Sequence, residues 1–200
     1  MKKVFTALMI AAAAYSGAAQ AGLVFESATP NGASSRGAES ALLTRFQVSS
    51  AINLSNFAVK GDLATDGNLK FVIFNSLTGQ LLFSSASTAF VDDGDTFKKS
   101  SAFSFTLQTG TTYALGAMAD VGFRQDFVSP GGLTVGAITS LGHNQNAQGF
   151  AAPILDAGLN GTDGIVRLYE ADAAAVPEPG SLALLALGLA GCATLRRKRS

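Results

Sequence analysis

The chain has 200 residues, with 14 Lys and Arg balanced by 14 Asp and Glu, and it contains one His, one Cys and no Trp. Without a surplus of basic residues the chain is not a nucleic-acid-binding protein, because neutralising phosphates needs a basic patch. One Cys excludes an intrachain disulfide, and one His excludes a two-His metal site. The charges are segregated: six of the basic residues lie at the two ends, so the middle of the chain is acidic.

Residues 1–21 are predicted to be a signal peptide. Lys2 and Lys3 form a positive start, and an apolar run too short to span a bilayer follows over residues 4–14. Ala19 and Ala21 are the small residues that a signal peptidase requires, so we expect cleavage after Ala21. The signal peptidase and the export machinery are therefore expected partners, and the chain beyond is expected to be exported.

Residues 22–172 are predicted to form the exported domain, an all-β, antiparallel β-sandwich with a jelly-roll-like arrangement. Apolar and polar residues alternate with a period of two in many short runs, whereas no long run has the 3.6-residue period of a helix. The many Phe residues are expected to fill the core. The strands expected from these patterns lie at residues 23–26, 42–48, 69–74, 80–83, 103–107, 111–118, 133–141 and 165–170.

Three local features of this domain follow from the same patterns. Turn residues predict a hairpin around Thr78 and Gly79, and a second hairpin that joins the strand at 103–107 to the strand at 111–118. The apolar phase changes between Leu54 and Phe57, which predicts a β-bulge there.

An acidic turn contains Asp92, Asp93 and Asp95, which are candidate calcium ligands. The spacing of a complete EF-hand loop is absent, because no Glu stands at the twelfth position. We therefore expect a solvated loop and no metal, with calcium binding as the alternative.

Catalytic patterns are missing from the chain. His143 lies in a polar stretch that resembles a loop, and no nucleophile elbow, phosphate-binding loop or dinucleotide-binding motif occurs. A hydrolase would have to use His143 or the acidic turn. The expectation is a protein without catalytic residues and without a cofactor.

The C-terminal segment has three parts. A linker with Pro177, Glu178 and Pro179 covers residues 173–181, where the prolines favour an extended, accessible backbone. Residues 182–195 are predicted to form a short hydrophobic membrane helix, shorter than the ~20 residues of a usual span. Residues 196–200 are predicted to be a cytoplasmic tail that fixes orientation by the positive-inside rule, through Arg196, Arg197, Lys198 and Arg199.

These three parts, in this order, resemble the PEP-CTERM sorting domain of Gram-negative bacteria. The resemblance implies recognition of Pro177, Glu178 and Pro179 by an exosortase-like membrane enzyme, which removes the helix and passes the body to the cell surface or beyond. It also implies an association with exopolysaccharide and biofilm. Cys192 is then either a small apolar residue of the helix or a palmitoylation site.

The expected function is thus that of a non-enzymatic surface or extracellular-matrix protein, anchored transiently in the inner membrane before release. Two alternatives stay open. The domain could be a carbohydrate-binding module, although sugar stacking favours Trp and Tyr and only Tyr113 and Tyr169 lie in the body. The tail could instead be a permanent anchor for a periplasmic β-domain.

Overall fold

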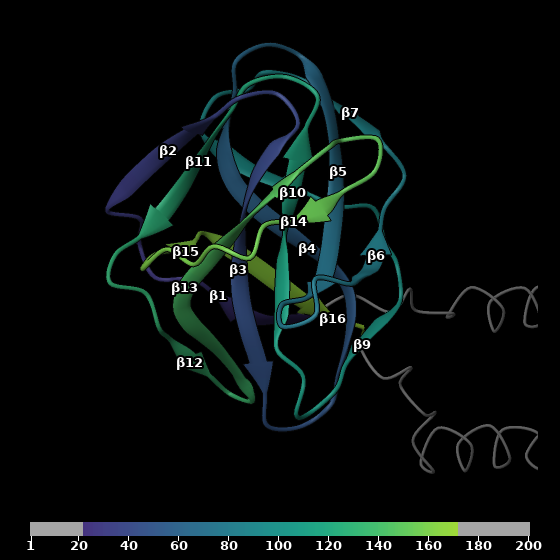
Figure 1. The fold of residues 1–200 in the computed structure, drawn as a ribbon, viewed down its shortest axis with the longest axis vertical. Helices are drawn as coiled ribbons and strands as arrows, with labels where there is room; N and C mark the ends of the chain where they lie inside the picture. The colour runs from purple at the N-terminus through teal and green to yellow at the C-terminus, as the bar shows by residue number, and fades with distance from the viewer. Residues whose placement is uncertain (1–21, 172–200) are drawn as a thin grey trace, which may run out of the picture. The chain divides into compact units, whose positions relative to one another are not determined.

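The computed structural model describes residues 22–171, which form two antiparallel β-sheets of eight strands each (Figure 1). No α-helix occurs among these residues, and none of them forms a helix that could cross a membrane. The prediction of an all-β, antiparallel domain is therefore confirmed, whereas the finer jelly-roll-like sandwich stays a prediction. The predicted signal helix and C-terminal hydrophobic helix lie outside the described residues.

The first sheet has β4 near its middle, paired with β16 and then β11 along one edge and with β8 and β9 along the other. β1 extends the sheet beyond β16, and β2 and β15 both pair with β11. Its strands are β1 (Gly22–Glu26), β2 (Gly32–Arg36), β4 (Ile52–Leu63), β8 (Thr96–Lys99), β9 (Phe105–Leu107), β11 (Phe123–Val128), β15 (Asp163–Gly164) and β16 (Val166–Glu170).

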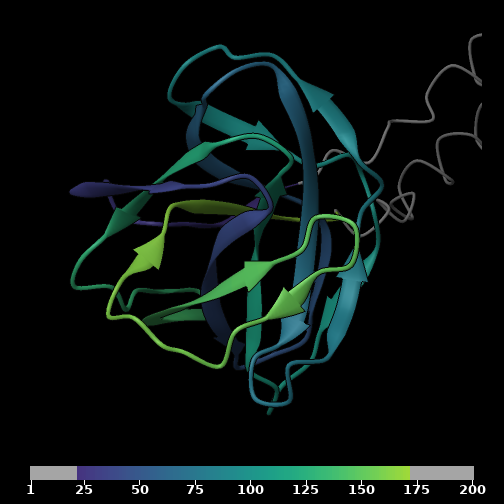
Figure 2. The same ribbon diagram turned by 45° about the horizontal axis from the view of Figure 1, so that its top comes forward.

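The second sheet has the order β12-β13-β3-β10-β5-β6, with β14 paired to β13 and β7 paired to β5. Figure 2 shows β13 and β14 as an antiparallel pair in green tones near the front. Its strands are β3 (Ser40–Val48), β5 (Gly67–Asn75), β6 (Leu81–Ser84), β7 (Thr88–Phe90), β10 (Tyr113–Ala119), β12 (Thr134–Val135), β13 (Ile138–Gln148) and β14 (Ile154–Leu155).

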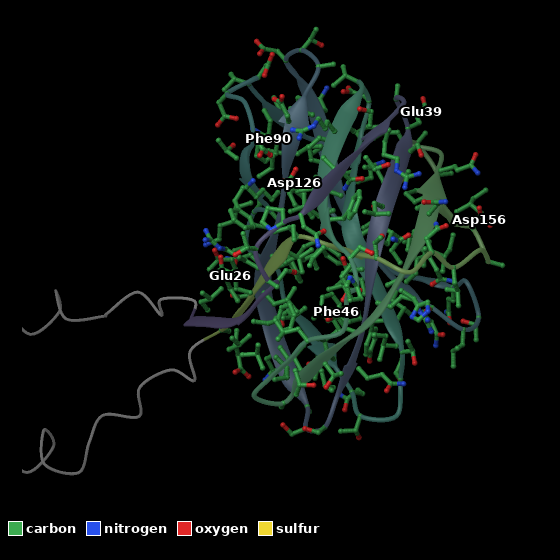
Figure 3. The ribbon with its side chains drawn as sticks, turned by 90° about the vertical axis from the view of Figure 1, so that its left-hand side faces the viewer. Glu26, Glu39, Phe46, Phe90, Asp126 and Asp156 are labelled. Carbon is green, nitrogen blue, oxygen red and sulfur yellow. The ribbon has the colours of Figure 1, made fainter. Side chains whose placement is uncertain are left out.

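The main core lies between the two sheets, and aromatic pairs connect them. Phe25 of β1 meets Phe46 of β3 edge to face at 5.1 Å, and Phe57 of β4 meets Phe71 of β5 at 5.3 Å. Edge-to-face pairs of this kind add about 0.5–1.5 kcal/mol beyond the area they bury. Figure 3 shows Phe46 between the sheets, with Glu26 of β1 on one side and Asp156 on the other.

A second, smaller apolar cluster covers the outer face of the second sheet. Phe150 and Leu155, from the segment that follows β13, pack against it. The outer face of this sheet is therefore partly buried, which explains why β5 and β10 are apolar on both faces. The buried members are Ala41, Leu43, Val72, Phe74, Ala114, Met118 and Ala147.

Several local predictions are confirmed. β5 and β6 form the hairpin expected around Thr78 and Gly79, where Gly79 has a φ of 74°. In the pairing of β4 with β16, Tyr169 lies opposite Asn56 while Glu170 lies opposite Leu54, so Ser55 is the extra residue of the expected bulge.

Other local predictions are wrong. The residues at 103–107 and 111–118 do not form a hairpin, because β9 pairs with β4 in the first sheet and β10 belongs to the second. The single strand expected at 133–141 is instead a turn between β12 and β13, with Gly136 at a φ of 55°. His143, expected in a loop, lies within β13 next to a register irregularity.

Candidate functional site

The acidic turn before β8 binds a lysine of its own chain. The ammonium group of Lys98, only 2% exposed, pairs with Asp93. It also donates to the carbonyl oxygen of Gly94 at 3.1 Å and to Oγ1 of Thr96 at 2.8 Å. Burial lowers the pKa of Lys98 below its ordinary value. Of the three candidate calcium ligands, Asp93 therefore contacts the ammonium group of Lys98.

A second lysine connects this turn to the sheet. Nζ of Lys60 in β4 donates to Oδ2 of Asp95 at 2.7 Å and to Oδ2 of Asp126 at 2.6 Å. Asp126 is 4% exposed, and these two hydrogen bonds raise the pKa of Lys60. Lys60 thus joins the acidic turn, β4 and β11 through one cation.

Asp92 forms no ion pair with any residue of the described domain. Its Oδ1 accepts a hydrogen bond from the backbone N–H of Gly94 at 3.4 Å, and its own N–H donates to Asp66 at 2.8 Å. The structure keeps the three predicted acids in one turn but points two of them at lysines. Among residues 22–171, no group of three His, Cys, Asp or Glu side chains is arranged to hold a metal ion. Calcium binding is the alternative to a solvated loop and stays untested, and these ion pairs argue against it.

His143 is exposed on β13. Its Nδ1 lies 3.0 Å from the carbonyl oxygen of Leu141, which is a local contact within the same strand. A nucleophilic triad needs the imidazole between a hydroxyl and a carboxylate. The imidazole of His143 instead contacts a backbone carbonyl oxygen, which is neither a hydroxyl nor a carboxylate.

The two tyrosines of the domain are not free for stacking on a sugar. Tyr113 is 3% exposed, and its hydroxyl accepts a hydrogen bond from the N–H of Gln108 at 2.8 Å. The ring of Tyr169 carries Nζ of Lys99 at 4.0 Å from its centroid. Arg167 covers Phe97 in the same way at 3.8 Å. These aromatic faces are occupied by the protein's own cations.

A groove of about 350 Å³ opens beside the smaller apolar cluster. Its polar side contains Arg45 of β3, Ser76 after β5 and Gln145 of β13. Nε of Arg45 donates to Oγ of Ser76 at 2.8 Å, and that hydroxyl donates to Oε1 of Gln145 at 2.6 Å. Ser76 and Gln145 are 6% and 3% exposed, so the guanidinium is oriented by buried partners.

The opposite side of the groove is apolar. Leu77, Leu155 and Leu159 line it, and Leu77 and Leu159 are 75% and 52% exposed. No pattern in the sequence indicated this groove. Arg45 follows Leu43 on the outward face of its strand, which is a weak signal, and nothing in the sequence connects it to Ser76 or Gln145.

The C-terminal candidates lie outside the described residues: Pro177, Glu178, Pro179, the basic cluster and Cys192. So do Ala19 and Ala21 of the predicted cleavage site. Residues 175–199 match the family model of the PEP-CTERM protein-sorting motif. A comparison with curated proteins found no match to the chain. The chain therefore carries the C-terminal motif of an exported protein sorted by an exosortase.

Proposed function

We propose that this chain is a non-enzymatic surface or extracellular-matrix protein of a Gram-negative bacterium, released from the inner membrane by an exosortase-like enzyme. The observation that carries the proposal is the sorting motif at residues 175–199. In this proposal the enzyme recognises Pro177, Glu178 and Pro179 of the motif, and residues 182–195 hold the tail in the membrane. The hydrophobic segment supports temporary anchoring, because it is shorter than the ~20 residues of a usual span.

The β-domain is the part that reaches the surface, as a jelly-roll-like sandwich preceded by a cleaved signal peptide. Its proposed role is association with exopolysaccharide in a biofilm. Two observations support a role without catalysis. His143 makes a local contact to a backbone carbonyl, and Asp93 and Asp95 are paired with lysines.

The test is the intact mass and the location of the protein in an exosortase-containing host. A triple variant, Pro177→Ala, Glu178→Ala and Pro179→Ala, is compared with the wild type. We expect the released wild type to lack residues 1–21 and the segment after the motif, while the variant stays in the inner membrane.

A conservative variant in the basic cluster, Arg196→Lys with Arg197→Lys, is a matched control within the same tail, because it keeps the positive charge that fixes orientation and leaves the proposed recognition residues intact. It should be released like the wild type. If the wild type instead keeps Arg199 and Ser200 in the membrane fraction, the tail is a permanent anchor and the proposal is wrong.

A further inference from the structure

Arg45 is one of four basic residues among residues 22–171 that pair with no carboxylate, the others being Arg36, Lys70 and Lys99, and of these four it is the one that lines the groove. Four of the eight basic side chains in residues 22–171 pair with a carboxylate, namely Lys60, Lys98, Arg124 and Arg167. Lys70 donates to the carbonyl oxygen of Phe150 at 2.6 Å, and Lys99 lies over Tyr169. Arg45 pairs with no carboxylate of the described residues, and it lines the groove.

The orientation of Arg45 leaves its outer nitrogens available. A guanidinium has five N–H donors in one plane. The hydrogen bond to Ser76 uses Nε alone, and the two Nη atoms donate to no group among residues 22–171. Two parallel N–H donors of a guanidinium match the two oxygens of a carboxylate. This pairing makes arginine selective for such groups.

The rest of the groove fits a ring that is polar on its edge and apolar on its face. Its volume lies within the range of small-ligand sites, about 300–1,000 Å³. Leu155 and Leu159 offer an apolar wall and Thr78 offers a hydroxyl group, while the side chains of Ser76 and Gln145 hydrogen-bond to each other. A sugar ring has this division between C–H faces and hydroxyl edges.

From these observations we propose that the groove binds one uronic acid unit of an acidic polysaccharide, with Arg45 holding its carboxylate. The choice of a polysaccharide rests on the proposed function, and the choice of an acidic sugar rests on the unpaired guanidinium. The remainder of the domain is acidic, so a polyanion gains attraction at this groove and little elsewhere on the surface.

Substituting Asp156 tests whether the ligand carries a negative charge. Asp156 is exposed between two groove residues, Leu155 and Ala157, and its Oδ1 accepts a hydrogen bond from the N–H of Gly158 at 3.0 Å. A carboxylate at the rim repels an anionic ligand. Asp156→Asn should therefore tighten binding by about two- to threefold at low ionic strength, and less in high salt.

The experiment is calorimetric titration of the purified full chain, as the host processes it, with galacturonate hexamer. The same hexamer with every carboxylate methyl-esterified is the neutral ligand. We expect the acid form to bind and the ester to bind at least tenfold more weakly. Arg45→Gln should weaken binding of the acid form by about ten- to a hundredfold, the usual value of a charge-assisted hydrogen-bonding pair.

Arg124→Gln is the matched control, because Arg124 is 48% exposed on the other sheet and should leave binding unchanged. Ser76→Ala keeps the charge but removes the partner of Nε, so it should weaken binding by an intermediate factor. Equal binding of acid and ester, or unchanged binding in Arg45→Gln, would overturn the proposal. If Arg45→Gln fails to fold, Asp156→Asn and the ester still decide it.

Failure of this proposal is distinguishable from failure of the proposed function. Arg45→Gln should be exported and processed like the wild type, because the sorting motif is intact. If the wild type is not processed, the titration is done on the detergent-solubilised chain. Binding without processing would refute the sorting proposal alone, and processing without binding would refute this one alone.

Discussion

Removing the ammonium group of Lys60 should destabilise three segments, namely the acidic turn, β4 and β11. It pairs with buried Asp126 and with Asp95, and it is itself 21% exposed. Lys60→Met keeps the apolar stem but leaves the Asp126 carboxylate with only Arg124 at 3.9 Å. Breaking a buried pair in this way costs about 3–5 kcal/mol. Because Lys60 is partly exposed, we expect a loss of about 2–3 kcal/mol in the free energy of unfolding, measured in urea at neutral pH.

The same pair has a defined pH dependence. The pKa of Lys60 is raised in the folded state, above the ordinary value of about 10.4. Its stabilisation is therefore complete below that pH and is lost as pH rises through the folded pKa. The difference between wild type and Lys60→Met should shrink above about pH 10.4. Lys99→Met, which removes a cation–π contact, should cost less than about 1 kcal/mol. Equal losses in the two variants would contradict this account.

At the scale of the strand, Gly116 sets how closely β10 approaches β3. A Cβ built at this position would lie 2.5 Å from Cδ2 of Leu43 and 2.7 Å from the carbonyl oxygen of Leu42. The side chain of Leu43 can shift, but the backbone oxygen is held in the sheet. We expect Gly116→Ala to lower the free energy of unfolding by about 1–3 kcal/mol, the usual cost of overpacking.

The control for this variant is Gly37→Ala, because a Cβ at Gly37 would meet nothing within 4 Å. That substitution should be neutral or slightly stabilising, since alanine reduces the freedom of the unfolded chain. Urea unfolding of both variants checks the prediction. Similar effects of the two substitutions would mean that steric contact with β3 does not restrict the size of the side chain at position 116.

Local patterns predicted the strands better than their pairing. Alternation identified β3 and β16, and a phase change identified the bulge at Ser55. The false hairpin has a physical reason. Phe105 and Tyr113 flank a short turn but meet edge to face at 6.0 Å from opposite sheets. Period-two alternation shows which face of a strand is apolar, and it does not show whether the next strand pairs beside it or packs across the core.

The groove could not be predicted for a related reason. Arg45, Ser76 and Gln145 come from three separate strands or turns, and only the order of strands in the second sheet brings them together. The acidic turn was visible in the sequence, but its pairing with Lys60 and Lys98 was not. The sorting tail is different, because its order of motif, hydrophobic segment and basic end is linear and needs no fold to be recognised.

At the scale of the whole molecule, the sorting tail is a linear motif whereas the groove depends on the fold. Sorting and binding are therefore predicted to be separable. The family match covers residues 175–199 and none of the β-domain. Residues 173–200 fused to an unrelated exported reporter should therefore direct its release in a host that contains an exosortase. The reporter's location and intact mass are the measurements, and the fusion that carries Pro177→Ala, Glu178→Ala and Pro179→Ala is the control, expected in the inner membrane. If the wild-type fusion stays there too, while the native chain is released, the β-domain itself contributes to recognition by the sorting enzyme.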